Sequence, residues 1–399
     1  MNDDGAVFKG SGSFKIDRER ALLKLSQFAL AKGELFLLPW VRCAAASGAK
    51  LLSAERGGGW LTVRFDGRGL APEELKDPYG GVFDDGGDAR LRHLAIGLLT
   101  CLRTDPKRIL IESGEGTARR RLTVLSPREE SLDPAPTDGR GTVIRVEWPF
   151  WRSWGIALPV LNNARLASPL VPPGFRFDGA SPLPPPQPAG LSSEFSAGPM
   201  RGLLHLPERG ITHSVVTLCV DGVAVENVKT WLPWAQVRAW VNDDGFALSA
   251  SQATVVEDDR RRAAFDALAA ASERFLAEAA QAHKDSSGTW EALRPWLLES
   301  AGRLLRDPAD DDARPALKAL WDAPLFLDAA HEPLSLRTLS VQKRRLGHVP
   351  WSRADCPGAT PAERVAWCPD AAAKACLTAR FGADLRDMTE LIESLARAK

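Results

Sequence analysis

The 399-residue sequence has no net charge, no long apolar run and no recognisable export signal. Its 51 basic and 51 acidic side chains cancel, so the chain lacks the overall basic character that attracts nucleic acid or an anionic membrane. No apolar run approaches the ~20 residues that span a bilayer, and the polar start MNDDGAVFKG is unlike a signal peptide. We therefore expect a cytoplasmic protein without nucleic-acid or membrane partners.

The cysteines and histidines are too scattered to form a common disulfide or metal framework. The six cysteines include no C-x-x-C pair, which favours buried thiols in a reducing compartment. A zinc site could be drawn from Cys356, Cys368, Cys376 and His348, but their spacing matches no common tetrahedral pattern. No Ser-His-Asp or Cys-His arrangement stands out either. We expect no metal site and no hydrolytic triad.

Tyrosine is nearly absent: the sequence contains one tyrosine but 13 tryptophans. Exposed tryptophans would mark a surface for a protein partner, because tryptophan is enriched in binding hot spots. Trp148, Trp151 and Trp154 lie near the end of the first expected domain. We expect these three residues to pack at the seam between this domain and the rest of the chain.

The first 150 residues contain helical and strand patterns that follow one another. Residues 14–54 have apolar side chains near helical spacing, with a break at Lys32–Pro39 because proline begins or kinks a helix. The apolar run LRHLAIGLLTCL predicts a further helix. Strand-like runs lie at about 60–66, 108–113, 120–125 and 142–148. This order predicts an α+β domain over residues 1–150, with helices layered on a sheet.

The composition then divides the rest of the chain. Residues 151–199 read as a connecting segment that ends in the Pro- and Ser-rich linker SPLPPPQPAGLSSEFSAGP. Residues 200–285 predict an α/β unit, with the strand pattern HSVVTLCVDGVAV and the helix pattern DDRRRAAFDALAAASERFLAEAAQAH. Residues 286–399 predict a small α/β subdomain with strands at PLFLD and GHVPW and terminal helices at DAAAKACLTARF and DMTELIESLARA.

Four segments of the chain carry a resemblance to a known family. They are residues 14–48 with FKID and ELFL, FDGRGLAPEEL (65–75), GRGTVIRV (139–146) and VRAWVNDDGFALSASQATVV (237–256). In this order they resemble the first two helices, the glycine turn, the closing strand and a middle-domain segment of the 90-kDa heat-shock chaperones, which belong to the GHKL ATPase superfamily. The resemblance implies a chaperone-type ATPase-like α/β sandwich, then a middle α/β domain with a shortened α/β end. The family's C-terminal dimerisation domain is expected to be missing.

The resemblance also implies an ATP pocket, yet its chemical positions carry unsuitable side chains. The family's water-activating glutamate corresponds to Pro39, and its magnesium-binding asparagine to Cys43, a poor ligand for a hard cation. The aspartate that reads the base corresponds to Phe65, and the arginine at the terminal phosphate to Gln252. Asp66 is expected to face the opposite side of its strand.

The residues that shape the family's pocket remain as a vestige. They are Asp66, Gly67, Gly69, Leu70, Gly97 and Thr142. We favour a plain turn for Gly67 and Gly69 over contact with a nucleotide, because glycine often serves only to allow a tight turn. Gly97 is the one glycine left in the run that corresponds to the family's phosphate lid.

These substitutions predict a pseudo-ATPase, a chaperone-like protein-binding scaffold or regulatory subunit without ATP hydrolysis. We expect no cofactor, with ATP and magnesium bound only if the pocket is functional, and a protein client or complex partner bound through the middle domain. One alternative is a chaperone ATPase with a rearranged pocket, in which Asp66 or Glu34 replaces the missing carboxylates. Another is a structural subunit of a multi-protein complex, such as a defence system.

Overall fold

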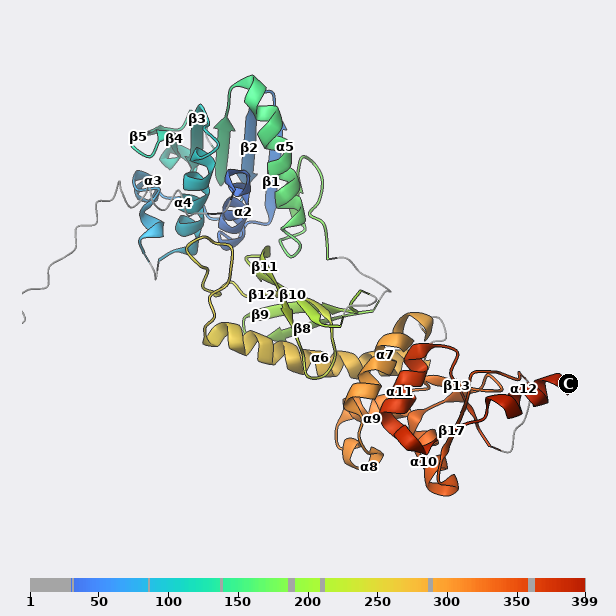
Figure 1. The fold of residues 1–399 in the computed structure, drawn as a ribbon. Coiled ribbons are helices and arrows are strands. Elements are labelled where there is room, and N and C mark those ends of the chain that lie inside the picture. The colour runs from blue at the N-terminus through green and yellow to red at the C-terminus, as the bar shows by residue number, and fades with distance from the viewer. Residues whose placement is uncertain are drawn as a thin grey trace, which may run out of the picture. The chain divides into compact units, whose positions relative to one another are not determined.

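The structure is a computed structural model that describes most of the chain (Figure 1). The described residues are 30, 32–84, 87–136, 139–185, 191–208, 212–285, 290–357 and 363–398. The chain forms two compact units. The first comprises Met1–Pro185, Leu218–Glu226 and Asn242–Glu257, and the second Pro186–Thr217, Asn227–Val241 and Asp258–Lys399. Helices and sheets occur in both, which confirms the predicted α+β class.

The first unit is built on a seven-stranded sheet with the order β5-β4-β3-β6-β2-β1-β7. Its strands are β1 (Leu51–Gly57), β2 (Trp60–Phe65), β3 (Arg108–Ser113), β4 (Arg120–Ser126), β5 (Glu129–Pro134), β6 (Thr142–Glu147) and β7 (Gly174–Phe177). Neighbouring strands are antiparallel except β1 and β7, which are parallel. The strands predicted near 60–66, 108–113, 120–125 and 142–148 are therefore confirmed as β2, β3, β4 and β6.

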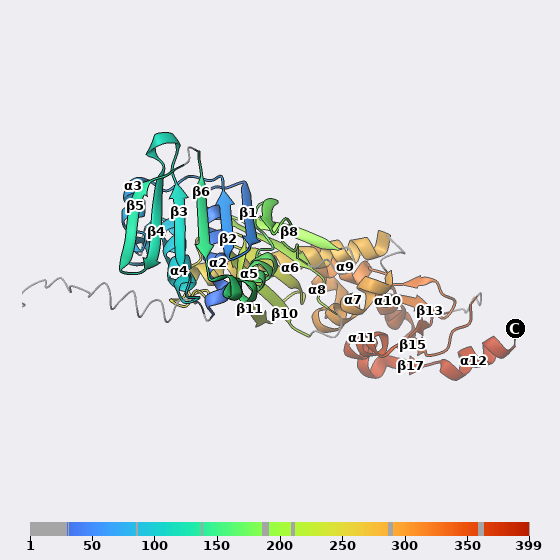
Figure 2. The same ribbon diagram turned by 90° about the horizontal axis from the view of Figure 1, so that it is seen from above.

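Three helices, α2 (Leu37–Ala46), α4 (Ala89–Leu102) and α5 (Phe150–Leu166), cover one face of this sheet (Figures 1 and 2). Every second residue of β6 is buried under them, because side chains alternate between the faces of a sheet. Short elements complete the unit: η1 (Gly33–Leu35), α3 (Pro72–Lys76), η2 (Gly80–Val82) and η3 (Gly116–Ala118). Helix α4 confirms the helix predicted from LRHLAIGLLTCL.

The sequence-based expectations need correction around this unit. Residues 51–54, expected to be helical, begin β1, where Leu52 and Ala54 are buried on the core side. The unit continues to Pro185 rather than ending at residue 150, because α5 and β7 pack on the sheet. Of the two helices expected over 14–54, the first lies outside the described residues and the second is α2.

A five-stranded sheet with the order β11-β10-β12-β9-β8 follows along the chain. Its strands are β8 (Ser192–Ala197), β9 (Met200–His205), β10 (Ser214–Val220), β11 (Val223–Thr230) and β12 (Arg238–Asn242). The end of the expected linker thus forms β8. The predicted long helix is α6 (Asp259–Asp285), whose buried side packs against β8 and β9. The tip of the β10–β11 hairpin belongs to the first unit.

The C-terminal part places helices around a small sheet with the order β14-β13-β16-β15-β17. The strands are β13 (Phe326–Asp328), β14 (Pro333–Leu334), β15 (Val349–Ser352), β16 (Ala366–Trp367) and β17 (Leu385–Asp387). The helices are α7 (Trp290–Leu304), α8 (Pro308–Asp311), α9 (Pro315–Asp322), α10 (Leu336–Leu346), α11 (Ala371–Phe381) and α12 (Thr389–Arg397), with the turn η6 (Gly382–Asp384). The strands predicted at PLFLD and GHVPW are confirmed as β13 and β15, and the two terminal helices as α11 and α12. Within the described ranges, no helix has both the length and the apolar character needed to cross a membrane.

Candidate functional site

Three side chains at the end of the central strands form one row on the helix-covered face of the sheet. Thr142 of β6 pairs in register with Phe65 of β2 and with Ser113 of β3, and directly paired residues share a face. Phe65 is only 5% exposed and lies in the core. Ser113 Oγ lies 2.7 Å from Thr142 Oγ1 and accepts a hydrogen bond from the Leu70 amide at 2.7 Å. The row therefore contains a phenyl ring and two hydroxyls that bind each other, with no carboxylate.

Asp66 is turned away from this row. Its carboxylate accepts hydrogen bonds from the backbone amides of Lys50 and Leu51, at 2.8 and 2.9 Å. The bond from Leu51 is the main reason why the pKa of Asp66 lies below its usual value. The carboxylate is exposed and engaged with the start of β1, so it cannot replace an aspartate at the position of Phe65.

The two glycines of the turn after Phe65 are explained by close packing within the first unit. A Cβ atom added to Gly67 would lie 1.9 Å from Ser47 Oγ and 2.8 Å from the Ser47 carbonyl oxygen. A Cβ atom on Gly69 would lie 3.1 Å from the Gly114 nitrogen. Leu70, which ends the turn, is 2% exposed and packs in the core. These contacts account for both glycines without a ligand.

Helix α2 places no ionised side chain at the expected catalytic positions. Pro39 is buried in the first turn of α2, where a missing amide hydrogen disrupts no helical bond. Cys43 lies one turn later and is 1% exposed. Burial raises the pKa of its thiol to about 12, so the thiol stays protonated at neutral pH. A protonated thiol is not a ligand for a hard cation such as magnesium.

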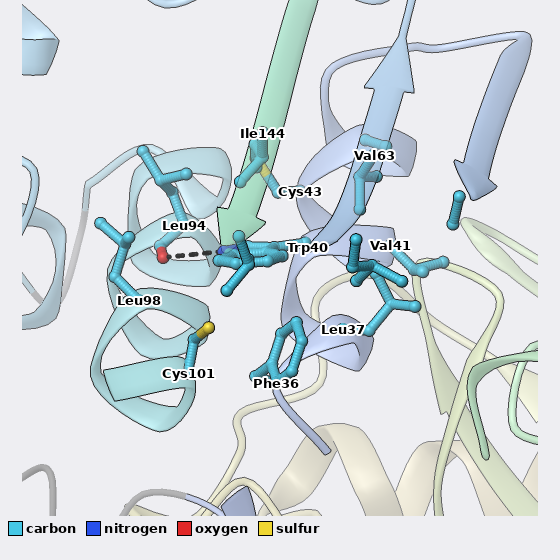
Figure 3. Packing of buried hydrophobic residues seen from close by; sticks show 14 of the residues in the cluster. Phe36, Leu37, Trp40, Val41, Cys43, Val63, Leu94, Leu98, Cys101 and Ile144 are labelled. Atoms are coloured by element: carbon cyan, nitrogen blue, oxygen red, sulfur yellow. Dashed lines mark hydrogen bonds between the residues drawn. The ribbon is translucent and has the colours of Figure 1, made fainter. Parts of the chain in front are cut away.

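Trp40 fills the space between α2 and α4 (Figure 3). Its indole is fully buried, and its Nε1 atom donates a hydrogen bond to the Leu94 carbonyl at 3.4 Å. A Cβ atom on Gly97 would lie 2.3 Å from that same Nε1 atom. Gly97 therefore lets the two helices approach each other, and Leu94 and Leu98 of α4 pack at the same contact.

A buried guanidinium, that of Arg90, joins the start of α4 to the glycine turn. Arg90 is 3% exposed, and its Nη2 atom lies 2.6 Å from Asp88 Oδ2 and 3.0 Å from Glu74 Oε1. Its Nη1 atom donates to the carbonyl oxygens of Arg68 and Gly69, at 3.3 and 3.2 Å. Burial alone would lower the pKa of Arg90, but the bonds to Asp88 and the charge of Glu74 hold that pKa above its ordinary value. We call Arg90, Asp88 and Glu74 the Arg90 cluster.

The charges of the Arg90 cluster act on the Cys43 thiol. After burial, the charge of Arg90 has the largest effect on the pKa of the Cys43 thiol, and Asp88 and Glu74 also contribute. The sequence analysis did not single out Arg90. The signal was local: Asp88 caps α4 by accepting a hydrogen bond from the Arg90 amide, and the same carboxylate binds the guanidinium two residues later.

Gln252 does not lie on the same side of the first unit as the Arg90 cluster. Its side-chain Nε2 atom lies 3.4 Å from the Ser249 carbonyl of its own loop, and its backbone has a positive φ of 55°. The neighbouring Ser251 carbonyl accepts from the Leu30 amide, and the Leu30 carbonyl accepts from Arg103 after the end of α4. Arg90 and Arg103 are separated along α4 by about 20 Å, at 1.5 Å per residue. Gln252 thus lies by the end of α4 opposite to the Arg90 cluster.

The side chains at the predicted pocket do not fit a magnesium–nucleotide complex. Pro39 and Phe65 offer no polar atom, and Cys43 offers a protonated thiol. The hydroxyl of Thr142 is already bound to Ser113. Among the described residues, no group of three or more histidine, cysteine, aspartate or glutamate side chains could hold a metal ion.

A separate cavity of about 290 Å³ lies in the first unit. It is lined by Arg56, Gly57, Ser153, Ala157 and Asp178. The charges at its wall already pair, since Arg56 Nε lies 2.9 Å from Asp178 Oδ2. None of the predicted site residues lines this cavity. No known protein-family model and no curated protein matches the sequence, so the likeness to the chaperones rests on the motifs above.

Proposed function

We propose that this protein is a chaperone-like pseudo-ATPase that binds a protein partner and does not hydrolyse ATP. The Arg90 cluster carries the proposal, because its charges act on Cys43, the position that the resemblance assigns to magnesium. In this proposal, the positive charge of the Arg90 guanidinium, which is bound by two carboxylates, replaces the metal cation of the family's pocket.

The cluster disfavours a nucleotide for electrostatic reasons. A phosphate that entered beside Cys43 would meet the carboxylates of Asp88 and Glu74, which repel it. To pair with Arg90 it would first have to displace both of them from a guanidinium that is 3% exposed. Leaving a buried donor without its partner typically costs about 1–3 kcal/mol, so a phosphate contact must first exceed this cost.

Calorimetric titration of the full chain with ATP and with ADP, in the presence of magnesium, tests the nucleotide half of this proposal. We expect no binding heat and no rise in the melting temperature at millimolar nucleotide, since a bound ligand would stabilise the fold by mass action. A micromolar dissociation constant would overturn it and favour an ATPase with a rearranged pocket.

The surface that supports partner binding is the β11–β12 loop of the second unit, which carries Trp231 and Trp234. Trp231 is 57% exposed, and the Arg303 guanidinium lies 5.2 Å from the centroid of its ring. Arg303 also donates hydrogen bonds to the carbonyls of Pro233 and Trp234, and Arg314 lies 4.6 Å from the Trp234 ring. The loop is thus tied down while one indole stays open to solvent, which is typical of a binding hot spot.

An aggregation assay tests whether the protein binds a protein partner. The full chain, without nucleotide, should suppress the aggregation of a thermally unfolding enzyme, and Trp231→Ala should weaken that suppression. Trp151→Ala is the matched control, because Trp151 is 82% exposed but lies on α5 of the first unit. Of the other tryptophans near the end of the first expected domain, Trp148 is buried in the core of the first unit, and the side chain of Trp154 lies outside the described residues. No suppression by the wild type, or an equal loss in both variants, would contradict the proposal.

A further inference from the structure

The tip of the β10–β11 hairpin is built into the core of the first unit. Val223, at the start of β11, is fully buried and belongs to the same apolar core as the helices α2 and α4. Its neighbour Gly222 has a φ of +76°, and a Cβ atom there would lie 2.6 Å from the Val171 nitrogen. The tip therefore enters a space that only a glycine backbone can occupy.

Two backbone hydrogen bonds fix this tip to the segment that follows α5. The Leu170 amide donates to the Gly222 carbonyl at 3.1 Å, and the Ala224 amide donates to the Ala167 carbonyl at 2.7 Å. These two amides lie on opposite sides of the contact, so each reports on whether the tip is in place.

Buried charges surround the same tip. Asp221 Oδ2 lies 3.1 Å from His93 Nε2 of α4, and both side chains are less than a tenth exposed. Arg42 of α2 is 1% exposed, and its Nη2 atom donates to the Ala224 carbonyl at 3.3 Å. Its Nε and Nη1 atoms have no hydrogen-bond partner among the described residues, so the positive charge is balanced at a distance, chiefly by Asp221.

We infer that the hairpin tip, residues 219–226, is an ionic latch in which Asp221 holds the tip against His93 and Arg42 without any nucleotide. Asp221 supplies the negative charge that allows Arg42 to be buried, and its carboxylate accepts the Nε2 hydrogen of a neutral His93. Every group in the latch is a side chain or backbone atom of this chain. This inference does not depend on the proposed pseudo-ATPase function.

The latch should open in acid. Burial lowers the pKa of His93, and the charges of Arg42 on α2 and Arg92 on α4 act in the same direction, against the bond to Asp221. Other ionisable groups also lie at the tip. Asp244 accepts a hydrogen bond from the Asp221 amide, Cys219 interacts with the charge of Arg42 and Cys43 with that of Asp221, and Glu226 accepts from the Val255 amide. A released or unfolded His93 binds a proton near its ordinary pKa of about 6.5, so acid favours release.

Hydrogen exchange on the full chain, followed by mass spectrometry, tests the latch. Asp221→Asn should speed exchange of the Leu170 and Ala224 amides by about tenfold or more, because it leaves Arg42 without its countercharge. Asp105→Asn is the matched control, since Asp105 forms an exposed ion pair with Arg152 in the same unit. Adding Arg42→Met to Asp221→Asn should restore most of the protection, because it removes the unbalanced charge.

A second measurement avoids substitution altogether. In the wild type, lowering the pH from about 7.5 to about 5.5 should deprotect the same two amides more than amides of the central strands, after correction for intrinsic exchange. Saturating magnesium–ATP should leave their protection unchanged. Unchanged exchange in Asp221→Asn, no rescue by Arg42→Met, no selective loss of protection in acid, or protection that depends on ATP would each overturn the latch.

Discussion

Two of the buried arginines in the first unit, Arg90 and Arg42, are stabilised in different ways. The guanidinium of Arg90 is in contact with two carboxylates and two carbonyls, all supplied by residues 68–88. Arg42 makes one hydrogen bond to a carbonyl 182 residues away, and its countercharge lies on the same distant hairpin. Arg90 thus completes a local structure, whereas Arg42 depends on a distant part of the chain being in place.

The largest effect that separates the two arginines is expected for Asp221→Asn. The substitution keeps the shape of the side chain and removes the negative charge opposite a fully buried guanidinium. An uncompensated buried charge typically costs about 3–5 kcal/mol, so the free energy of unfolding should fall by that order. Urea unfolding of the full chain measures this change, and a loss no larger than that of Asp105→Asn would contradict it.

Asp88→Asn should cost less, about 1–3 kcal/mol. Arg90 keeps Glu74 and two carbonyl acceptors, and asparagine still caps the start of α4. Urea unfolding under the same conditions provides the comparison with Asp221→Asn. If Asp88→Asn were the more damaging of the two, the distinction between a locally satisfied and a distantly compensated arginine would be wrong.

Lowering the pH should destabilise the contacts around Arg42 more than those around Arg90. The pKa of folded His93 lies below its ordinary value, because burial disfavours the charged imidazole. The unfolded chain therefore binds more protons, and stability falls as the pH drops below about 6.5, by about 1.4 kcal/mol for each unit of pKa shift. His93→Gln should flatten this acid limb of a melting-temperature profile, whereas Asp88→Asn should leave its slope in place.

Glu74→Gln should have the smallest effect, within about 1 kcal/mol. Glu74 is 19% exposed at its side chain, so water can replace part of its contacts. Its Oε2 atom accepts from the Ala71 amide and its Oε1 atom from Arg90, so the single amide oxygen of glutamine keeps one of these two bonds. Thermal unfolding of this variant beside Asp88→Asn checks the order of the two. A larger loss for Glu74→Gln would mean that Glu74, not Asp88, is the principal partner of Arg90.

The two arginines also show what the sequence could and could not predict. Strands β2, β3, β4 and β6 were predictable because their residues favour strands by themselves. Strand β1 was not predictable, because its sequence LLSAERG lacks β-branched residues. Its extended conformation comes from pairing with β2. The positions that the resemblance assigns to a pocket could be named from motifs. The partners of Arg42 could not, because they come together only through the tertiary fold.

The most direct test of the central claim is calorimetric titration of the full chain with magnesium–ATP, beside the Arg90→Ala variant. The account predicts no binding heat for the wild type, because the Arg90 cluster and Phe65 fill the positions assigned to metal and base. It also predicts none for Arg90→Ala, since Phe65, Pro39 and Cys43 still supply no ligand. Saturable micromolar binding by the wild type would contradict the account.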